Sequence, residues 1–301
     1  MKKISTSIII LTKNRAQLLE KNLSSLTRQI IKPTEIIIID NNSTDKTSKV
    51  IKKYQRLLPI KYFKNSGSGY SKLYNFGIQK ASSNLICFLD DDCAAEKTWL
   101  REILKVYTKN KQSVIQGQTY SLPKNNLYAQ IMNDHYQNWL KSNLINSQEL
   151  KFLDNKNAAI PKEILIKYGS FSEKQGIGSE DLELSIRLKK NGVKIIFAPK
   201  AIAWHHERDN FCAFVQQHWR IARSEASLDQ NIDKNERIGI FPPKKTWLNV
   251  KSFVKRLVQL FKEGNLKQAI KAVAIYPVLF VTRIAGYLLK IFKVKQLPEA
   301  V

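Results

Sequence analysis

Three short apolar runs near the start of the chain constrain the fold more than any other feature. They are SIIILT (residues 7–12), EIIIID (35–40) and LICFL (85–89). Strands that are apolar at nearly every position are buried on both faces, which is typical of parallel sheets covered by helices. Helical patterns over 16–28, 45–58, 70–81 and 96–108 alternate with these runs and with a fourth short strand at 60–63. The alternation predicts an α/β fold with a mostly parallel sheet.

Length and composition bound the domain organisation. The chain has 301 residues, which suits one large domain or one domain with an appendage. Its apolar fraction of 43% excludes a mostly disordered chain. Three cysteines are too few for a disulfide scaffold, and their spacing fits no zinc motif. The pattern along the chain predicts three segments, 1–117, 118–235 and 236–301, with a junction at Phe241-Pro242-Pro243.

The charge is strongly positive. A formal net charge of +25 suggests an anionic partner, which would be nucleic acid, a membrane surface or a phosphorylated substrate. Most of the cations are lysines, and a bias in codon composition would explain them equally well. Net charge therefore does not decide between these partners.

Polar residues follow the predicted strands at 12–15, 40–45 and 90–92. Ligands of open parallel sheets bind beyond the carboxyl ends of the strands. Asp90, Asp91 and Asp92 repel one another unless a cation neutralises them, as Mg²⁺ or Mn²⁺ does at a diphosphate. The alternative is a solvated acidic turn that caps the next helix. The position directly after a buried strand favours the metal.

Other candidate groups each have a functional and a structural interpretation. Asp40 accepts hydrogen bonds either from a ribose or base of a ligand or, as a helix cap, from backbone amides of the next helix. The glycine-rich run 65–69 lets the backbone approach a ligand beside a helix N-terminus. Glu180 and Asp181 are either the acidic first turn of a helix or include a general base. His205 and His206 are surface residues or metal ligands.

Together these segments resemble the family-2 inverting glycosyltransferases, which have the GT-A fold. The resemblance covers residues 5 to about 220, and its segments occur in the family's order. They are SIIILTKNR, EIIIIDNNSTD, NSGSGYSKLYNFGI, LICFLDDDCAAEKTWL, DNKNAAIPKEILIKYGSFSE, GIGSEDLELSIRLKKNG and AIAWHHERDN. The expected architecture is thus a GT-A-type, mostly parallel sheet flanked by helices, with a helical, basic and apolar C-terminal extension. Residues 1–117 would bind the nucleotide-sugar and 118–235 the acceptor.

The resemblance implies a role for each matched residue. The nucleoside would be held by Thr12, Asn14, Arg15 and Asp40, with Asp90 near the ribose. Asp92 would ligate the metal, with Asp90 and His205 as further candidate ligands and His206 a weaker one. Asp181 would be the catalytic base and Glu180 would contact sugar or acceptor. Asp91, Lys72, Asn75 and Asn157 complete the predicted donor site.

The chain departs from the family pattern in two places. Leu73-Tyr74-Asn75 stands where the family often has Ala-Arg-Asn, so an arginine for the diphosphate is missing and Lys72 is its candidate substitute. Ser170-Phe171-Ser172-Glu173 stands where the family has Gly-Phe-Asp-Glu, which weakens inference about the acceptor loop.

The expected reaction is metal-dependent transfer of a sugar, with inversion, from a nucleoside-diphosphate-sugar to a hydroxyl of a glycan or lipid-linked acceptor in cell-surface polysaccharide synthesis. Two rivals are a nucleotidyltransferase and a basic nucleic-acid-binding protein. The first normally has a glycine-rich basic loop after its first strand, which this chain lacks. The second is disfavoured because acidic residues cluster at the predicted strand ends, so no nucleic-acid partner is expected.

The C-terminal segment suggests a membrane surface. Residues 272–281 are continuously apolar, but Pro277 and Arg283 make a spanning helix unfavourable, and lysines between 244 and 295 flank the run. Peripheral contact with an anionic membrane is predicted, the alternative being that these helices pack on the main domain. The apolar run at 8–11 is too short for a signal peptide. A cytoplasmic location at the inner face of the plasma membrane is therefore expected.

Overall fold

The computed structural model describes residues 4–65, 69–173, 180–229 and 243–291, which form two compact units. Unit 1 contains the described residues of 1–122, 143–174 and 180–206, and unit 2 those of 123–142 and 207–301. The predicted segment boundaries at 117 and 235 stay a prediction, and residues 241 and 242 of the predicted junction lie outside the described residues.

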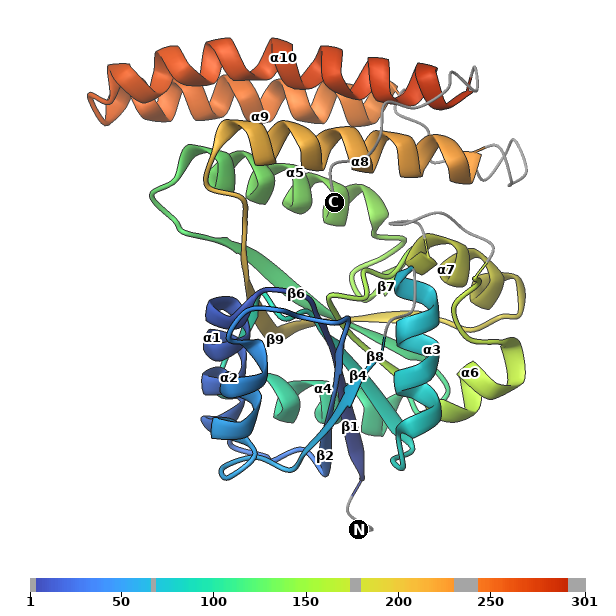
Figure 1. Cartoon of the computed structure of the whole chain (residues 1–301). Coiled ribbons are helices and arrows are strands. Elements are labelled where there is room, and N and C mark those ends of the chain that lie inside the picture. Colours follow the sequence, from blue (N-terminus) through green and yellow to red (C-terminus); the bar gives the residue numbers. More distant parts are fainter. Residues whose placement is uncertain (1–3, 66–68, 174–179, 230–242, 292–301) are drawn as a thin grey trace. The chain divides into compact units, whose positions relative to one another are not determined.

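Among the described residues, unit 1 is built on a nine-stranded sheet (Figure 1). Its strands are β1 (Thr6–Thr12), β2 (Glu35–Asp40), β3 (Ile60–Lys64), β4 (Leu85–Leu89), β5 (Cys93–Ala95), β6 (Val114–Leu122), β7 (Glu149–Leu150), β8 (Asn157–Pro161) and β9 (Ile195–His206). They lie in the order β3-β2-β1-β4-β8-β6-β9-β5, with β7 also paired to β9. The first four strands in this order are mutually parallel, whereas β8 is antiparallel to both of its neighbours.

Helices cover both faces of this sheet, as the apolar strands predict. They are α1 (Ala16–Thr27), α2 (Thr47–Tyr54), α3 (Tyr70–Lys80), α4 (Trp99–Lys109), α6 (Lys162–Tyr168) and α7 (Glu180–Lys190). Helices α1, α2 and α4 share one core with Ile8 and Ile36, on one face of β1 and β2. Helix α3 lies on the other face, where Gly77 brings its backbone against Ile9. The predicted α/β sheet flanked by helices is confirmed; it is parallel from β3 to β4 and mixed beyond β4.

Two strands in the middle of the sheet, β6 and β8, were not predicted from the sequence. Asn157 begins β8 and is fully buried. Its Nδ2 donates to the carbonyls of Gln118 (2.9 Å) and Ala201 (3.1 Å), and its Oδ1 accepts from Trp99 Nε1 (2.7 Å). A Cβ at Gly117 in β6 would lie 2.4 Å from both side-chain atoms of this amide. Glycine is therefore required at 117 by close packing.

Unit 2 is helical in its described residues. Its helices are α5 (Leu127–Asn143), α8 (Phe211–Asp229), α9 (Pro243–Lys262) and α10 (Leu266–Ile291). Only Asn143, the last residue of α5, belongs to unit 1. One apolar cluster joins all four helices through Ile131, Phe214, Leu260 and Ile275. Arg256 of α9 also forms a bidentate ion pair with Asp134 of α5 (Nη2 to Oδ2, 2.9 Å). The predicted helical C-terminal extension is thus present.

Candidate functional site

The candidate site lies at the carboxyl ends of β1, β2 and β4 in unit 1. The register pairs Thr12, the last residue of β1, with Asp40, the last residue of β2. Strand β4 ends at Leu89, so the aspartate triplet follows at once. Since these strands are parallel, their polar ends lie on one edge of the sheet, which is where an open α/β sheet binds its ligands.

An internal cation partly neutralises the aspartate triplet. Arg15, just after β1, places its Nη1 2.8 Å from Asp91 Oδ1 and 2.9 Å from Asp92 Oδ2. Both aspartate side chains are almost buried. Burial and the charge of Asp92 still raise the pKa of Asp91 to about 6, although Arg15 opposes this shift. Arg15 was predicted to hold the nucleoside, but in this structure its guanidinium binds the triplet.

Asp90 occupies a separate position and is half-buried, whereas Asp91 and Asp92 are buried. Its Oδ1 accepts a hydrogen bond of 3.1 Å from the hydroxyl of Tyr74 on α3. Burial, followed by the charge of Asp92, raises the pKa of Asp90 to about 7. Asn22 of α1 holds the turn itself, because its Nδ2 donates to the carbonyls of Asp90 (2.9 Å) and Cys93 (2.8 Å). Tyr74 stands where the family often has arginine, so a neutral donor faces Asp90 at this position.

Asp92 and His205 form the candidate metal centre. Strands β5 and β9 pair with Cys93 opposite His205, and the His206 amide donates to the Asp92 carbonyl at 2.8 Å. This register places His205 Nε2 3.3 Å from Asp92 Oδ1. The potential ligand atoms of Asp92, Cys93 and His205 all lie within 4.8 Å of one another.

The chemistry of these donors fits a hard divalent cation. A carboxylate with an imidazole suits Mn²⁺, and Mg²⁺ accepts the carboxylate together with phosphate oxygens. Burial raises the pKa of the Cys93 thiol well above its ordinary value, and the charges of Asp92 and Asp90 add to this shift. A thiol that stays protonated is a poor ligand. Asp92 and His205 are therefore the candidate ligands of this group, and Cys93 is not.

Two acidic residues at the start of α7 form the second half of the site. Glu180 is buried, and Leu182 donates its amide to Asp181 Oδ1 at 2.8 Å. Burial raises the pKa of Asp181 well above its ordinary value, and the charges of Glu180 and Asp154 raise it further. A carboxyl group with a raised pKa is suited to accept a proton from a hydroxyl.

Asp154 and Lys156 lie between these two halves and were not predicted. The Lys156 Nζ is 2.6 Å from Asp154 Oδ2, and both side chains are largely buried. The Lys156 carbonyl accepts a hydrogen bond from the Asp90 amide at 3.3 Å. The charge of Asp154 raises the pKa of Asp90 as well as that of Asp181. A charged pair directly before the buried strand 157–161 is the signal that would have found them.

The predicted nucleoside residues lie at the same edge, but several are already engaged. Asp40 is fully buried, and it accepts from the Ser43 amide (2.8 Å) and the Tyr62 hydroxyl (2.7 Å). Asn14 has a positive φ of 52° and accepts from the Thr44 amide (2.7 Å), so it links the loops after β1 and β2. Thr12 is buried at the end of β1.

Two residues of the predicted donor site have structural roles instead. Both polar atoms of the Asn157 amide are hydrogen-bonded inside the sheet, so this amide does not face a ligand. The amide of Asn75 is engaged on both sides: its Oδ1 accepts from the Phe171 amide (3.0 Å) and its Nδ2 donates to the Phe171 carbonyl (2.9 Å). Asn75 therefore fastens α3 to the segment after α6. Lys72 is exposed on α3, and its contact with a diphosphate stays a prediction.

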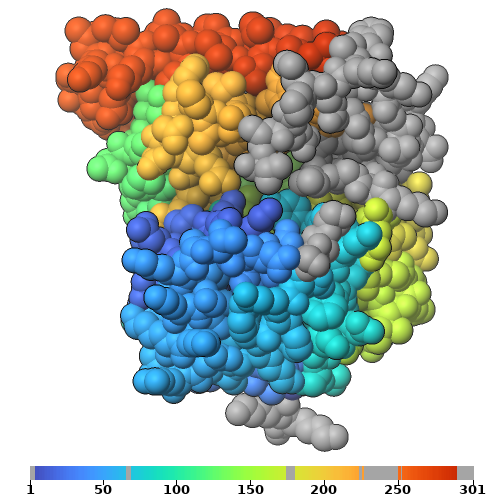
Figure 2. Space-filling model, viewed as in Figure 1, coloured from blue at the N-terminus to red at the C-terminus, as the bar shows by residue number. Residues whose placement is uncertain are grey.

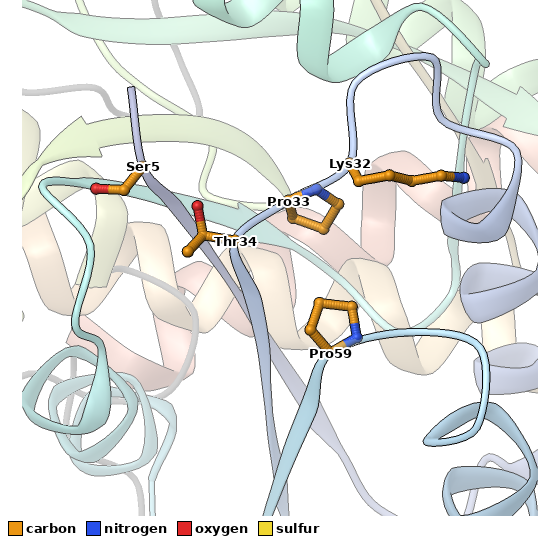
Figure 3. Close-up of a pocket in the computed structure, with 5 residues that line it drawn as sticks. All are labelled: Ser5, Lys32, Pro33, Thr34 and Pro59. Carbon is orange, nitrogen blue, oxygen red and sulfur yellow. The ribbon is translucent and has the colours of Figure 1, made fainter. Parts of the chain in front are cut away.

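A hollow at the opposite edge of the sheet does not belong to this site. Ser5, Lys32, Pro33, Thr34 and Pro59 line it (Figure 3). These residues precede β1, β2 and β3, so the hollow lies at the amino ends of the strands. No aspartate of the candidate site lines it.

Comparison with known families decides the classification. Residues 7–169 match the family described as Glycosyl transferase family 2. The chain belongs to this family. Its match covers β1 to α6, including the aspartate triplet and the Asp154–Lys156 pair, so unit 1 contains a family 2 glycosyltransferase domain, as the sequence motifs predicted.

Individual relatives are glycosyltransferases of different specificity. A chondroitin synthase of Pasteurella multocida is 27% identical over 241 residues, which are 68% of this chain and 25% of that protein. The chain therefore spans about a quarter of that relative's length. A GalNAc(5)-diNAcBac-PP-undecaprenol beta-1,3-glucosyltransferase of Campylobacter jejuni is 42% identical over 89 residues, 29% of each chain.

Solved structures confirm the GT-A fold. A mannosyltransferase of Pyrobaculum calidifontis, solved in complex with GDP-Man and Mn²⁺, matches with a TM-score of 0.64 and 17% identity. The match covers 98% of this chain and 89% of that one. At this identity the likeness concerns the fold.

Proposed function

We propose that this family 2 protein transfers a sugar from a nucleoside-diphosphate-sugar to an acceptor hydroxyl, with inversion at the anomeric carbon and with a divalent metal. One observation carries the proposal: unit 1 combines a carboxylate–imidazole pair, Asp92 and His205, with a second acid, the half-buried Asp181, whose pKa is raised. A leaving diphosphate needs positive charge, and an attacking hydroxyl needs a base. The two halves of the site supply groups for both tasks.

Asp181 accepts the proton of the acceptor hydroxyl as its oxygen attacks the anomeric carbon. The new bond forms on the face opposite the departing diphosphate, so one displacement inverts the configuration and requires no covalent intermediate. Glu180, buried beside it, keeps the pKa of Asp181 high. A base of raised pKa holds the proton that it takes until the product leaves.

Asp92 and His205 would hold the metal. A Mn²⁺ or Mg²⁺ bound there would stabilise the charge that develops on the nucleoside diphosphate. Arg15 faces the same carboxylates, so it provides a second positive charge at the carboxyl end of β1. Lys156 adds a third cation between Asp90 and Asp181, and Lys72 remains the predicted substitute for the missing arginine.

The acceptor is proposed to be a glycan or a lipid-linked glycan of the cell surface. The names of the relatives support this class, since one is a chondroitin synthase and another acts on an undecaprenol-linked glycan. A cytoplasmic location at the inner face of the plasma membrane, with peripheral contact through residues 244–295, is proposed with it.

The nucleic-acid and nucleotidyltransferase alternatives are disfavoured. Acidic side chains gather at the carboxyl edge of the sheet, where phosphates of a nucleic acid would be repelled. The match to family 2 covers the same edge. These observations support a donor that reaches the aspartates together with its own cation.

The test is a thermal unfolding panel of nucleoside diphosphates and nucleotide-sugars, each with and without Mn²⁺. A ligand at a hundredfold excess over its Kd stabilises the folded state by about 2.7 kcal/mol. We expect a metal-dependent rise of the midpoint with the sugar nucleotide of one base, and loss of turnover in chelator that Mn²⁺ or Mg²⁺ restores. The absence of any shift in folded protein, or full turnover in chelator, would contradict the proposal.

A further inference from the structure

Unit 2 exposes an apolar surface on α9 and α10 that its own core does not use. Its members are Val250, Val254, Val258 and Phe261 on α9 and Leu266, Ile270, Val273, Phe280, Val281 and Leu288 on α10. Each is between 40% and 63% exposed. Spacings of three, four and seven residues place them along one face of each helix. We call this set the apolar stripe; Figure 2 shows the surface of both helices in orange to red at the top of the view.

The stripe is separate from the face by which α10 joins the unit. Ala269, Ala272, Ile275 and Leu279 are buried and belong to the unit 2 core, on the side of α10 opposite the stripe. Gly286 continues this contact, because a Cβ there would lie 3.2 Å from Ala222 of α8. Helix α10 is therefore apolar on two faces, one packed and one open.

A lysine directly follows five members of the stripe. The pairs are Val250-Lys251, Val254-Lys255, Phe261-Lys262, Leu266-Lys267 and Ile270-Lys271, and all five lysines are exposed. Consecutive residues of a helix are about 100° apart, so these ammonium groups line one margin of the stripe on both helices. Glu263 is the only acidic residue between 243 and 291. An apolar strip with a cationic margin is the pattern of a helix that lies at a membrane interface.

We propose that the stripe of α9 and α10 docks in the plane of an anionic lipid bilayer, with the apolar side chains in the acyl boundary and the five lysines at the headgroups. The inference deepens the membrane contact of the proposed function and rests on that function for its purpose, which is access to a lipid-linked acceptor. Lipid binding itself requires neither donor nor catalysis.

Docking in the plane is favoured over crossing the bilayer. Helix α10 is long and apolar enough to span a bilayer: the segment Leu266–Leu289 has a mean hydropathy of 1.7. A spanning α10 would have to leave α8 and expose the core around Phe214 and Leu260. It would also carry Lys267, Lys271 and Arg283 into or near the hydrocarbon, at a cost of several kcal/mol. In-plane docking keeps the bundle intact.

A second copy of this chain is a poorer occupant. A two-fold interface built on the stripe would place lysines of both copies at its margins, and only Glu263 is available to offset them. Like charges across an interface disfavour association. Anionic headgroups offer the complementary charge.

The experiment is co-sedimentation of the full chain with vesicles of phosphatidylcholine alone or mixed with phosphatidylglycerol. We expect binding to the mixed vesicles and release at about 1 M salt, where the screening length is about 3 Å.

Replacing Lys255, Lys262 and Lys271 with glutamine should weaken binding about a hundredfold, since each lysine is worth roughly fivefold in affinity. The double variant Phe261→Asn, Ile270→Asn should also weaken it. The matched controls are Lys105, Lys109 and Lys111→Gln and Ile166→Asn, exposed positions in unit 1, which should bind normally.

Equal binding by the lysine variant, or equal binding to neutral vesicles, would overturn the proposal. Retention of the protein on vesicles through high salt and alkaline carbonate would show a spanning helix and also overturn it. A dimer in light scattering that the Phe261→Asn, Ile270→Asn variant dissolves, without vesicle binding, would assign the stripe to a second copy. The donor-dependent thermal shift, measured without vesicles, tests the proposed function separately.

Discussion

Replacement of Arg15 by glutamine tests whether this residue is the internal counter-ion of the aspartate triplet. Arg15 contacts Asp91 Oδ1 at 2.8 Å and Asp92 Oδ2 at 2.9 Å. Those two side chains are 4% and 8% exposed, whereas that of Arg15 is 28% exposed. Glutamine keeps a hydrogen-bond donor but removes the charge. Two nearly buried carboxylates then lose the cation that faces them both.

The size of the effect follows from this burial. Removal of one partner from a buried ion pair costs about 3–5 kcal/mol. The lower end applies here, because Arg15 is partly solvated and because Asp91, with its pKa already at about 6, can take up a proton. We therefore expect a loss of about 3 kcal/mol, which lowers the unfolding midpoint of a domain this size by about 6–12 °C.

Thermal unfolding with and without Mn²⁺ is the assay. Arg15 and a cation face the same carboxylate of Asp92, so Mn²⁺ should raise the midpoint of Arg15→Gln more than that of the wild type. Lys53→Gln is the matched control, because Lys53 pairs with Glu20 at 2.6 Å and both side chains are exposed, by 61% and 42%. An exposed pair contributes little to stability. If both variants lost the same stability and responded equally to Mn²⁺, the counter-ion role of Arg15 would be refuted.

Three further predictions separate catalysis from folding. Asp181→Asn should lower turnover by about 10²–10⁴-fold. The variant should not lose stability, because it removes a charge that burial disfavours. Wild-type activity should rise with pH above the ordinary carboxyl pKa of 3.8, and the activity of the variant should not. Glu35→Gln should cost at most about 3 kcal/mol near neutral pH, because hydrogen bonds from Lys61, Ser7 and Ser82 outweigh burial and lower the pKa of Glu35 from 4.5 to about 2. This stability is present above pH 4.5 and is lost as pH falls through about 2, so an acid titration of unfolding that is identical in the two proteins would contradict it. Gly117→Ala should strongly destabilise the protein, because its Cβ would lie 2.4 Å from the Asn157 amide. Gly192→Ala, with φ +74° and open space around the Cβ, should cost about 1–2 kcal/mol. Chemical denaturation that ranks the two variants in the reverse order would refute the close packing at Gly117.

The first half of the fold was predictable because its strands are apolar on both faces. The run 35–40 is observed as β2 with the same bounds, and 85–89 as β4. Strand β6 was missed for the opposite reason. β6 carries Gln116 and Gln118, buried polar residues whose amides bond to the main chain, so its sequence lacks an apolar period. Buried polar residues inside a strand leave no apolar period in its sequence.

Sequence position predicted which candidate residues meet at one edge of the sheet but did not give their partners. The ends of β1, β2 and β4 were expected to meet, and the register places Thr12 beside Asp40. Asn75 and Asn157 show the limit of this reasoning. The family resemblance implied that both asparagines contact the donor, yet both amides bond to other parts of unit 1. Contacts between residues far apart in the sequence decide between the two uses.

The aspartate triplet shows how the structure changes an argument for a metal. Three adjacent carboxylates demanded a cation, and Arg15 together with the raised pKa values of Asp90 and Asp91 meets part of that demand within the protein. The charge of the triplet is therefore weak evidence for a metal. The stronger evidence is His205, which the pairing of β5 with β9 brings to 3.3 Å from Asp92. Since Arg15 holds the other oxygen of Asp92, a donor that arrives with its cation must share or displace that contact, and the Mn²⁺ response of Arg15→Gln measures this competition directly.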